Sequence, residues 1–192
     1  MLTAKQYFSA LLLGSTLALG MSQQRLANAE LPPIQSEASL LHRRINLDGV
    51  RVFEAKTKRW QPYRKGSESL LILHLWAVEC APCIAEMPTL RNIVFGWRDE
   101  ADLRFLFISE TLDEKKLLEY WRANAERVPA VSLYQNTDNR IRDVLETGKQ
   151  PLTLLVDQDL VIRQAFIGTL SERNHELAAS MTRLLAVVRR KK

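Results

Sequence analysis

The strongest constraint on the fold lies between Leu70 and Leu90, in the stretch LLILHLWAVECAPCIAEMPTL. The stretch begins as a continuous apolar run, which is typical of a strand buried on both faces. Cys80 and Cys83 follow in a C-x-x-C spacing, and beyond them apolar residues recur at helical spacing. A helix N-terminus stabilises a thiolate through its free N–H groups and partial positive charge. We therefore predict a strand, a redox-active cysteine pair and a helix.

Length and composition limit the size of the domain and the kinds of partner and site that the chain can have. The chain has 192 residues, enough for one domain with a sizeable core. Its formal net charge of +5 favours acidic partners or a membrane surface only weakly, and we expect no nucleic-acid partner. The two cysteines form no structural disulfide framework, and the histidines show no zinc-ligand spacing. Neither a metal nor a cofactor is therefore predicted.

The first 29 residues have the pattern of a secretory signal peptide. Lys5 precedes an apolar block, and Ala27-Asn28-Ala29 forms an A-x-A cleavage site. We expect cleavage after Ala29 and export to the periplasm. An uncleaved inner-membrane anchor facing the periplasm is the alternative, although the block is short for a membrane span. Residues 30–42, with Pro32-Pro33, are expected to form a linker, and residues 43–192 the domain.

Within that domain, strand and helix patterns alternate. Residues 44–53 predict a hairpin that turns at Asp48-Gly49. Further strands are predicted at 70–76, 103–108 and 131–134, and in a final hairpin formed by 151–157 and 161–167. Helices are predicted at 83–97, 113–127, 139–146 and 171–189, the first kinked or restarted at Pro88. This order predicts an α/β fold with segregated layers.

Three motifs resemble those of a known family. Residues 76–83, Trp-Ala-Val-Glu-Cys-Ala-Pro-Cys, resemble the W-A-x-W-C-x-P-C active site of the thioredoxin superfamily, and Pro88 matches the proline of its first helix. Ala85-Glu86-Met87-Pro88 is similar to the AEMP of the TlpA/ResA-type (DsbE-like) periplasmic thiol-disulfide oxidoreductases. Residues 148–157 are similar to that family's G-x-P-T-T-F-L-I-D, where the proline is cis. The resemblance implies a thioredoxin-like fold: a central mixed β-sheet flanked by helices, with an N-terminal β-hairpin and an inserted strand-helix unit.

The same resemblance implies a protein disulfide reductase without a cofactor. Cys80 would be the nucleophile and Cys83 the resolving cysteine, while Gln150 and Pro151 would bind substrate. Pro151 could also simply begin a strand. Ala81-Pro82 offers no donor or cation to a thiolate, which favours a reductant over an oxidant. The implied partners of this expected monomer are proteins with disulfides or thiols, as in cytochrome c maturation, and a membrane thiol reductant as electron donor. A copper-handling chaperone is the alternative.

Three further residues are candidates for tuning the cysteines. Glu79 stands where many relatives carry Trp, and its charge would raise the pKa of Cys80 unless it is a solvated surface residue. His74 lies six residues before Cys80, where thioredoxins bury an acid. It is either a proton relay or an ordinary core residue. Trp76 is expected to form a packing wall of the site.

Overall fold

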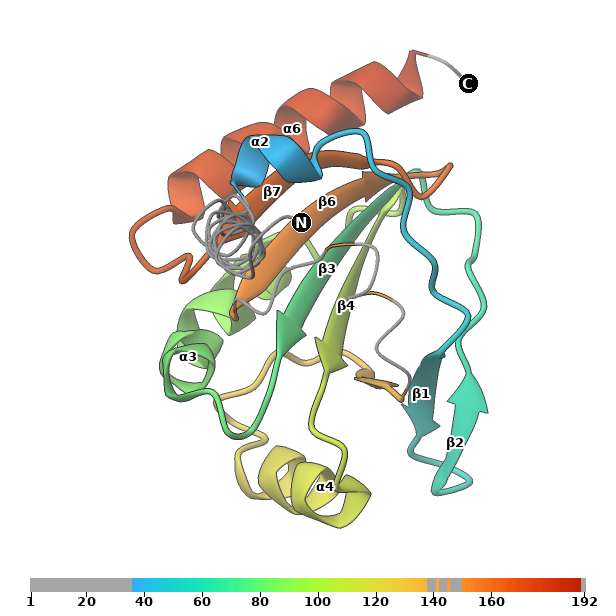
Figure 1. Cartoon of the computed structure of the whole chain (residues 1–192), viewed down its shortest axis with the longest axis vertical. Helices are drawn as coiled ribbons and strands as arrows, with labels where there is room; N and C mark the ends of the chain where they lie inside the picture. Colours follow the sequence, from blue (N-terminus) through green and yellow to red (C-terminus); the bar gives the residue numbers. More distant parts are fainter. Residues whose placement is uncertain (1–35, 138–140, 142–144, 146–149, 191–192) are drawn as a thin grey trace, which may run out of the picture. The chain divides into compact units, whose positions relative to one another are not determined.

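The computed structural model describes residues 36–137, 141, 145 and 150–190. In this part of the chain seven strands form one mixed sheet, in the order β2-β1-β5-β4-β3-β6-β7 (Figure 1). Pairing is parallel between β3, β4 and β5 and antiparallel elsewhere. The strands are β1 (Val50–Glu54), β2 (Arg59–Pro62), β3 (Leu70–Trp76), β4 (Leu103–Ser109), β5 (Leu133–Asn136), β6 (Leu152–Asp157) and β7 (Ile162–Ile167).

The central strand β3 separates two apolar cores. All seven of its residues are buried, as its continuous apolar run predicts. Leu70, Ile72 and Trp76 face a core shared with helices α3 (Ala81–Gly96), α4 (Glu114–Ala123) and α6 (Asn174–Arg189). The alternating residues 71, 73 and 75 face a second core, to which helix α2 (Glu37–Leu40) contributes Leu40. The predicted thioredoxin-like arrangement of a mixed sheet flanked by helices is confirmed.

Helix α3 runs through Pro88 without interruption. Its N-cap is Cys80, and Pro82 occupies its first turn, where the missing N–H has no intrahelical partner to lose. Cys83, Met87 and Leu90 form its buried face. The helix therefore carries both cysteines at the end of the sheet where β3 terminates.

The N-terminal hairpin exists, but its predicted turn is wrong. β1 and β2 pair from Arg51↔Pro62 to Glu54↔Arg59, so the chain reverses at residues 55–58. Asp48-Gly49 forms a turn before β1, held by the bond from the Val50 N–H to the Leu47 carbonyl (3.0 Å). The segment before that turn cannot pair with β1, because it lies along β7: Arg44 forms a bridge with Val161.

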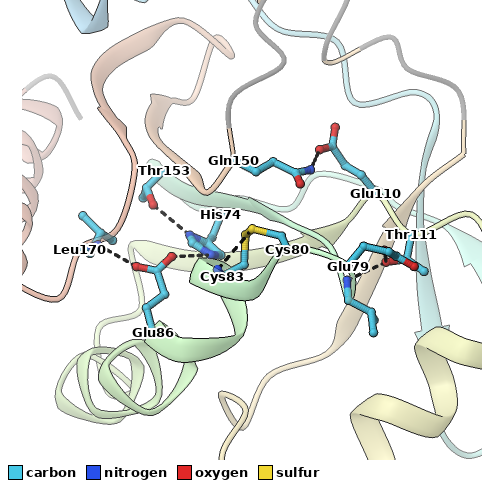
Figure 2. Close-up of a disulfide and its surroundings, with 11 residues drawn as sticks. His74, Glu79, Cys80, Cys83, Glu86, Glu110, Thr111, Gln150, Thr153 and Leu170 are labelled. Carbon is cyan, nitrogen blue, oxygen red and sulfur yellow. Dashed lines mark hydrogen bonds and ion pairs between the residues drawn. A yellow bond between two sulfur atoms is a disulfide. The ribbon is translucent and has the colours of Figure 1, made fainter.

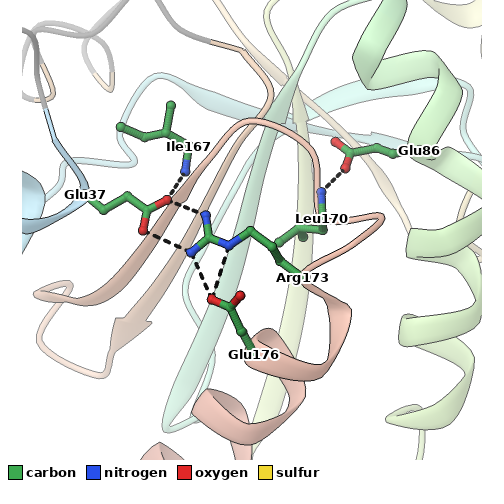
Figure 3. Close-up of polar contacts among 6 residues, drawn as sticks. All are labelled: Glu37, Glu86, Ile167, Leu170, Arg173 and Glu176. Carbon is green, nitrogen blue, oxygen red and sulfur yellow. Dashed lines mark hydrogen bonds and ion pairs between the residues drawn. The ribbon is translucent and has the colours of Figure 1, made fainter.

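Part of the expected linker belongs to the fold. Helix α2 is capped by the Ser36 side chain and packs against β7. The Arg173 guanidinium, at the start of α6, binds both oxygens of Glu37 (2.6 and 3.1 Å) and reaches Glu176 (Figure 3). Glu37 also accepts the Ile167 N–H at 2.9 Å. The folded unit thus begins before residue 43, because this stretch caps the β7 edge of the sheet.

The inserted strand is β5, which begins two residues later than predicted. It pairs in parallel with β4 and antiparallel with β1, so it joins the hairpin to the central sheet. The helix predicted at 139–146 lies outside the described residues, except for Ile141 and Leu145, which are buried in the second core.

The β6–β7 turn is built without glycine. Leu160 adopts a left-handed conformation (φ 61°), which usually favours glycine. The Asp157 carboxylate accepts the N–H groups of Asp159 and Val161 at 2.9 and 3.0 Å and forms an ion pair with Arg163. These contacts of the Asp157 side chain hold the turn between β6 and β7.

Candidate functional site

Cys80 and Cys83 form a disulfide at the start of α3, with an S–S distance of 2.01 Å (Figure 2). The Cys80 sulfur caps the helix by accepting the Cys83 N–H at 3.3 Å. Cys83 is fully buried, whereas Cys80 is half-buried. Of the two sulfurs, the one on Cys80 is therefore the one open to an incoming substrate.

Three segments of the chain meet at this end of the sheet. The loop after β3 carries the disulfide, and the Glu110 N–H, just after β4, donates to the Trp76 carbonyl at 2.8 Å. Leu152 pairs with Leu75, which brings the start of β6 alongside the same loop. The Gln150–Pro151 peptide bond is cis, as the resemblance implied. The Gln150 side-chain amide donates to the Glu110 carboxylate, so the residue before the proline is tied to the loop after β4.

His74 and Glu86 form a buried pair beneath the disulfide. His74 Nδ1 lies 2.9 Å from the Thr153 hydroxyl, and its Nε2 lies 3.5 Å from Glu86 Oε1. The second Glu86 oxygen accepts the Leu170 N–H at 2.7 Å. His74 Nε2 and Glu86 Oε1 have no hydrogen-bond partner in the described part of the chain, so each faces mainly the other.

Burial shifts both pKa values of this pair, in opposite directions. Because burial disfavours the charged forms, it raises the pKa of Glu86 to about 7 and lowers the pKa of His74 to about 3. The bond from the Leu170 N–H opposes the rise for Glu86. Near neutral pH the histidine is neutral, while the carboxyl group is the member that exchanges a proton.

Glu79 is not the isolated charge that the sequence suggested. Its carboxylate binds Lys116 Nζ at 2.7 Å and accepts the Thr111 hydroxyl at 3.0 Å. The hydrogen bond from Lys116 is the largest cause that lowers the pKa of Glu79. Lys116 thus compensates the negative charge beside Cys80, which weakens the repulsion expected between Glu79 and a Cys80 thiolate.

The similarity of this chain to known proteins lies in its structure. No family model and no curated relative matches the sequence. A protein proposed to be the thiol:disulfide interchange protein DsbE, from Chlorobium tepidum, matches with a TM-score of 0.56 at 15% identity, over 76% of this chain and 99% of its own. A protein proposed to be a disulfide isomerase, from Bacteroides thetaiotaomicron, matches with a TM-score of 0.58 at 15% identity, over 80% and 92%. An uncharacterized thioredoxin-like protein from Porphyromonas gingivalis matches with a TM-score of 0.52 at 17% identity, over 72% and 90%. The chain has a thioredoxin-like fold.

Trp76 is a packing residue of this thioredoxin-like fold. Its side chain is completely buried, and its ring lies 5.8 Å from the rings of Tyr120 and Trp121 on α4. Trp76 therefore packs the end of β3 against α4, and its role as a wall of the cysteine site stays a prediction.

Glu86 is the residue that the sequence reasoning missed. The AEMP resemblance included it, but no role was assigned. It follows Cys83 by three residues on α3, so it shares the buried face of Cys83 and Met87. A carboxylate placed among apolar positions at helical spacing was the available signal.

Two further properties of the described residues bear on the site. In the ranges listed above, no three or more His, Cys, Asp or Glu side chains cluster in a way that could hold a metal ion. Nor does any helix within those ranges combine the length and apolar character needed to cross a membrane.

Proposed function

We propose that the protein is a thiol-disulfide oxidoreductase that reacts through Cys80. One observation carries this proposal: a half-buried sulfur at the N-terminus of α3 is bonded to a fully buried one, beside a cis peptide bond. In the reduced protein the free N–H groups of the helix stabilise the Cys80 thiolate. The thioredoxin-like neighbours with thiol-disulfide names support the same chemistry.

In the reductive direction the dithiol form begins the reaction. The Cys80 thiolate attacks a substrate disulfide, forms a mixed disulfide and expels one substrate thiolate, which takes up a proton. Cys83 then loses its proton and attacks the Cys80 sulfur. This breaks the mixed disulfide, releases the second substrate thiol and leaves the Cys80–Cys83 disulfide. Two electrons pass to the substrate, and a donor must restore the dithiol.

Glu86 is our candidate acceptor for the Cys83 proton. It lies one helical turn from Cys83, and burial places its pKa at about 7, where a carboxylate can both take and return a proton. His74 Nε2 lies 3.5 Å from one oxygen of the carboxyl group, and we assign His74 the role of a positioning residue. The histidine relay considered from the sequence thus becomes a pair in which Glu86 titrates.

We further propose that the protein reduces proteins in the periplasm. The side chains of Ala81 and Pro82 supply no cation to stabilise the Cys80 thiolate, and a weakly stabilised thiolate favours a low reduction potential. Export by the signal peptide of residues 1–29, cleaved after Ala29, would bring the protein into an oxidising compartment. A reductant there needs a membrane thiol donor. Substrates of the cytochrome c maturation type fit this role, with Gln150 and Pro151 binding the substrate chain.

Two measurements test the proposal. Cys83→Ser should accumulate a mixed disulfide with a disulfide-bonded peptide, whereas Cys80→Ser should not; turnover by both variants would contradict the assigned order. The reduction potential, followed by Trp76 fluorescence in a thiol buffer, should lie below about −230 mV for a reductant. A value near about −120 mV would reverse the direction of flow. The lack of any reversible transition would favour the copper-handling alternative.

A further inference from the structure

The sheet has an opening between β4 and β1. β5 joins these two strands, but it begins at Leu133, which pairs with Phe107. β4 begins four residues earlier, at Leu103, so among the described residues its first half has no partner on the β5 side. Across the opening, Phe53 and Glu54 of β1 pair with β2 and with no other strand that the structure describes. Because adjacent strands lie about 4.8 Å apart, the opening has the width of one missing strand.

A groove of about 1120 Å³ occupies this opening. Residues 103–105 of β4 line the groove, and so do residues 130–132, which directly precede β5 in the chain. Phe53 of the hairpin, Trp97 at the end of α3 and Trp121 near the end of α4 add aromatic surface. The groove therefore offers apolar side chains together with the unpaired side of a strand, which is what an extended peptide needs.

The charged side chains that line the groove determine which kind of peptide would bind there. Its lining contains four cations and one carboxylate: Lys56, Arg98, Arg104 and Arg122 against Glu54. Lys56 and Arg122 make no ion pair with any of the described residues. Arg98 and Arg104 each form one ion pair, with Asp99 at 3.5 Å and with Glu68 at 3.9 Å. Lys56 and Arg122 are therefore the cations of the groove that lack a counter-charge among the described residues. An acidic segment would complement this surface, and a basic one would be repelled.

The groove lies far from the disulfide. Cys80 caps the N-terminus of α3, whereas the groove contacts Val94 at the other end of the helix. At about 1.5 Å per residue, the helix separates them by roughly 20 Å. A partner held in the groove would leave Cys80 accessible.

We propose that this groove binds an extended acidic segment of a partner protein, as an added strand beside β4. The proposal does not depend on the direction of electron flow or on the cysteines. A flat bilayer would meet the hairpin tip but could not enter a slot one strand wide, so the recessed geometry favours a peptide over anionic lipid.

The test uses the oxidised full chain and a fluorescein-labelled peptide of about seven residues that alternates Asp or Glu with Val or Leu. We expect the anisotropy to rise on binding, and a matched peptide with Lys at the acidic positions to bind at least about ten-fold more weakly. Hydrogen exchange of the amides in residues 103–106 should slow when the acidic peptide is bound.

Matched variants distinguish binding of the peptide in the groove from a general effect of the protein's charge. Arg98→Glu with Arg122→Glu should weaken binding of the acidic peptide about ten-fold. Arg183→Glu, an exposed arginine on α6 outside the groove, should change it less than about two-fold. Equal binding of both peptides, no binding at all, or no response to the double reversal would overturn the proposal. So would binding to anionic phospholipid vesicles without binding to the peptide. Unchanged unfolding transitions show that the variants are folded.

Discussion

The buried Glu86 makes a quantitative prediction about stability. Its pKa rises from the ordinary value of 4.5 to about 7 in the folded protein, chiefly because of burial. A carboxyl group with a raised folded pKa adds stability that is full below pH 4.5 and is lost as the pH rises through about 7. At about 1.4 kcal/mol per pH unit, the loss is about 3 kcal/mol.

Glu86→Gln should remove that loss. Gln matches the shape of the protonated acid, and its carbonyl can still accept the Leu170 N–H that Glu86 binds at 2.7 Å. In urea unfolding of the oxidised protein, the variant should equal the wild type near about pH 4 and exceed it by about 3 kcal/mol near about pH 8. Resolution of a mixed disulfide should slow in the same variant, because the Cys83 proton loses its acceptor.

Glu79→Gln is the matched control for this measurement. The pKa of Glu79 is lowered by Lys116, so this group stays ionised over most of the range and its removal should cost no more than about 1 kcal/mol at either pH. A difference between Glu86→Gln and the wild type that stays constant from pH 4 to pH 8 would refute the reasoning, because Glu86 would then not titrate in this window.

Three further changes test other contacts. In the wild type, stability is lost as the pH falls from 6.5 towards about 3, because His74 binds a proton in the unfolded chain but stays neutral when it is buried. His74→Asn should reduce this loss, and unfolding measurements at acid pH would show the difference. Lys116→Ala should raise the pKa of Cys80 in the reduced protein by about half a pH unit, because Glu79 loses its counter-charge; thiolate absorbance measures this. Arg173→Ala should lower the free energy of unfolding by about 1 kcal/mol relative to Arg183→Ala, by freeing Glu37.

Local pattern predicted the elements that depend on burial alone. The apolar run placed β3, and the C-x-x-C spacing placed the cysteine pair at the head of α3. The cis bond before Pro151 was implied by the resemblance to a known family and is present in the structure. The amphipathic pattern of α4 likewise placed Leu117 inside.

Features that depend on distant partners could not be predicted. The Asp48-Gly49 signal does mark a turn, but the hairpin lies elsewhere because residues 44–45 pair along β7. The charge of Glu79 looked unopposed because Glu79 lies in the loop before α3, whereas Lys116 lies 37 residues further along the chain, on α4. The role proposed for His74 depends on Glu86, and only the fold brings His74 Nε2 to 3.5 Å from Glu86 Oε1.

The contacts of residues 37–45 also decide how the sheet avoids self-association. β7 is an edge strand, and exposed edges invite pairing with a second chain. Here the Glu37 carboxylate takes the Ile167 N–H, and His42 and Ile45 bind the carbonyls of Ile162 and Leu160 at 2.9 Å each. A shortened chain beginning at residue 46 would keep the disulfide, but it would lose Leu40 and Ile45 from the second core and present a bare strand edge. Residues 37–45, most of which lie in the predicted linker, thus protect the β7 edge from pairing with a second chain.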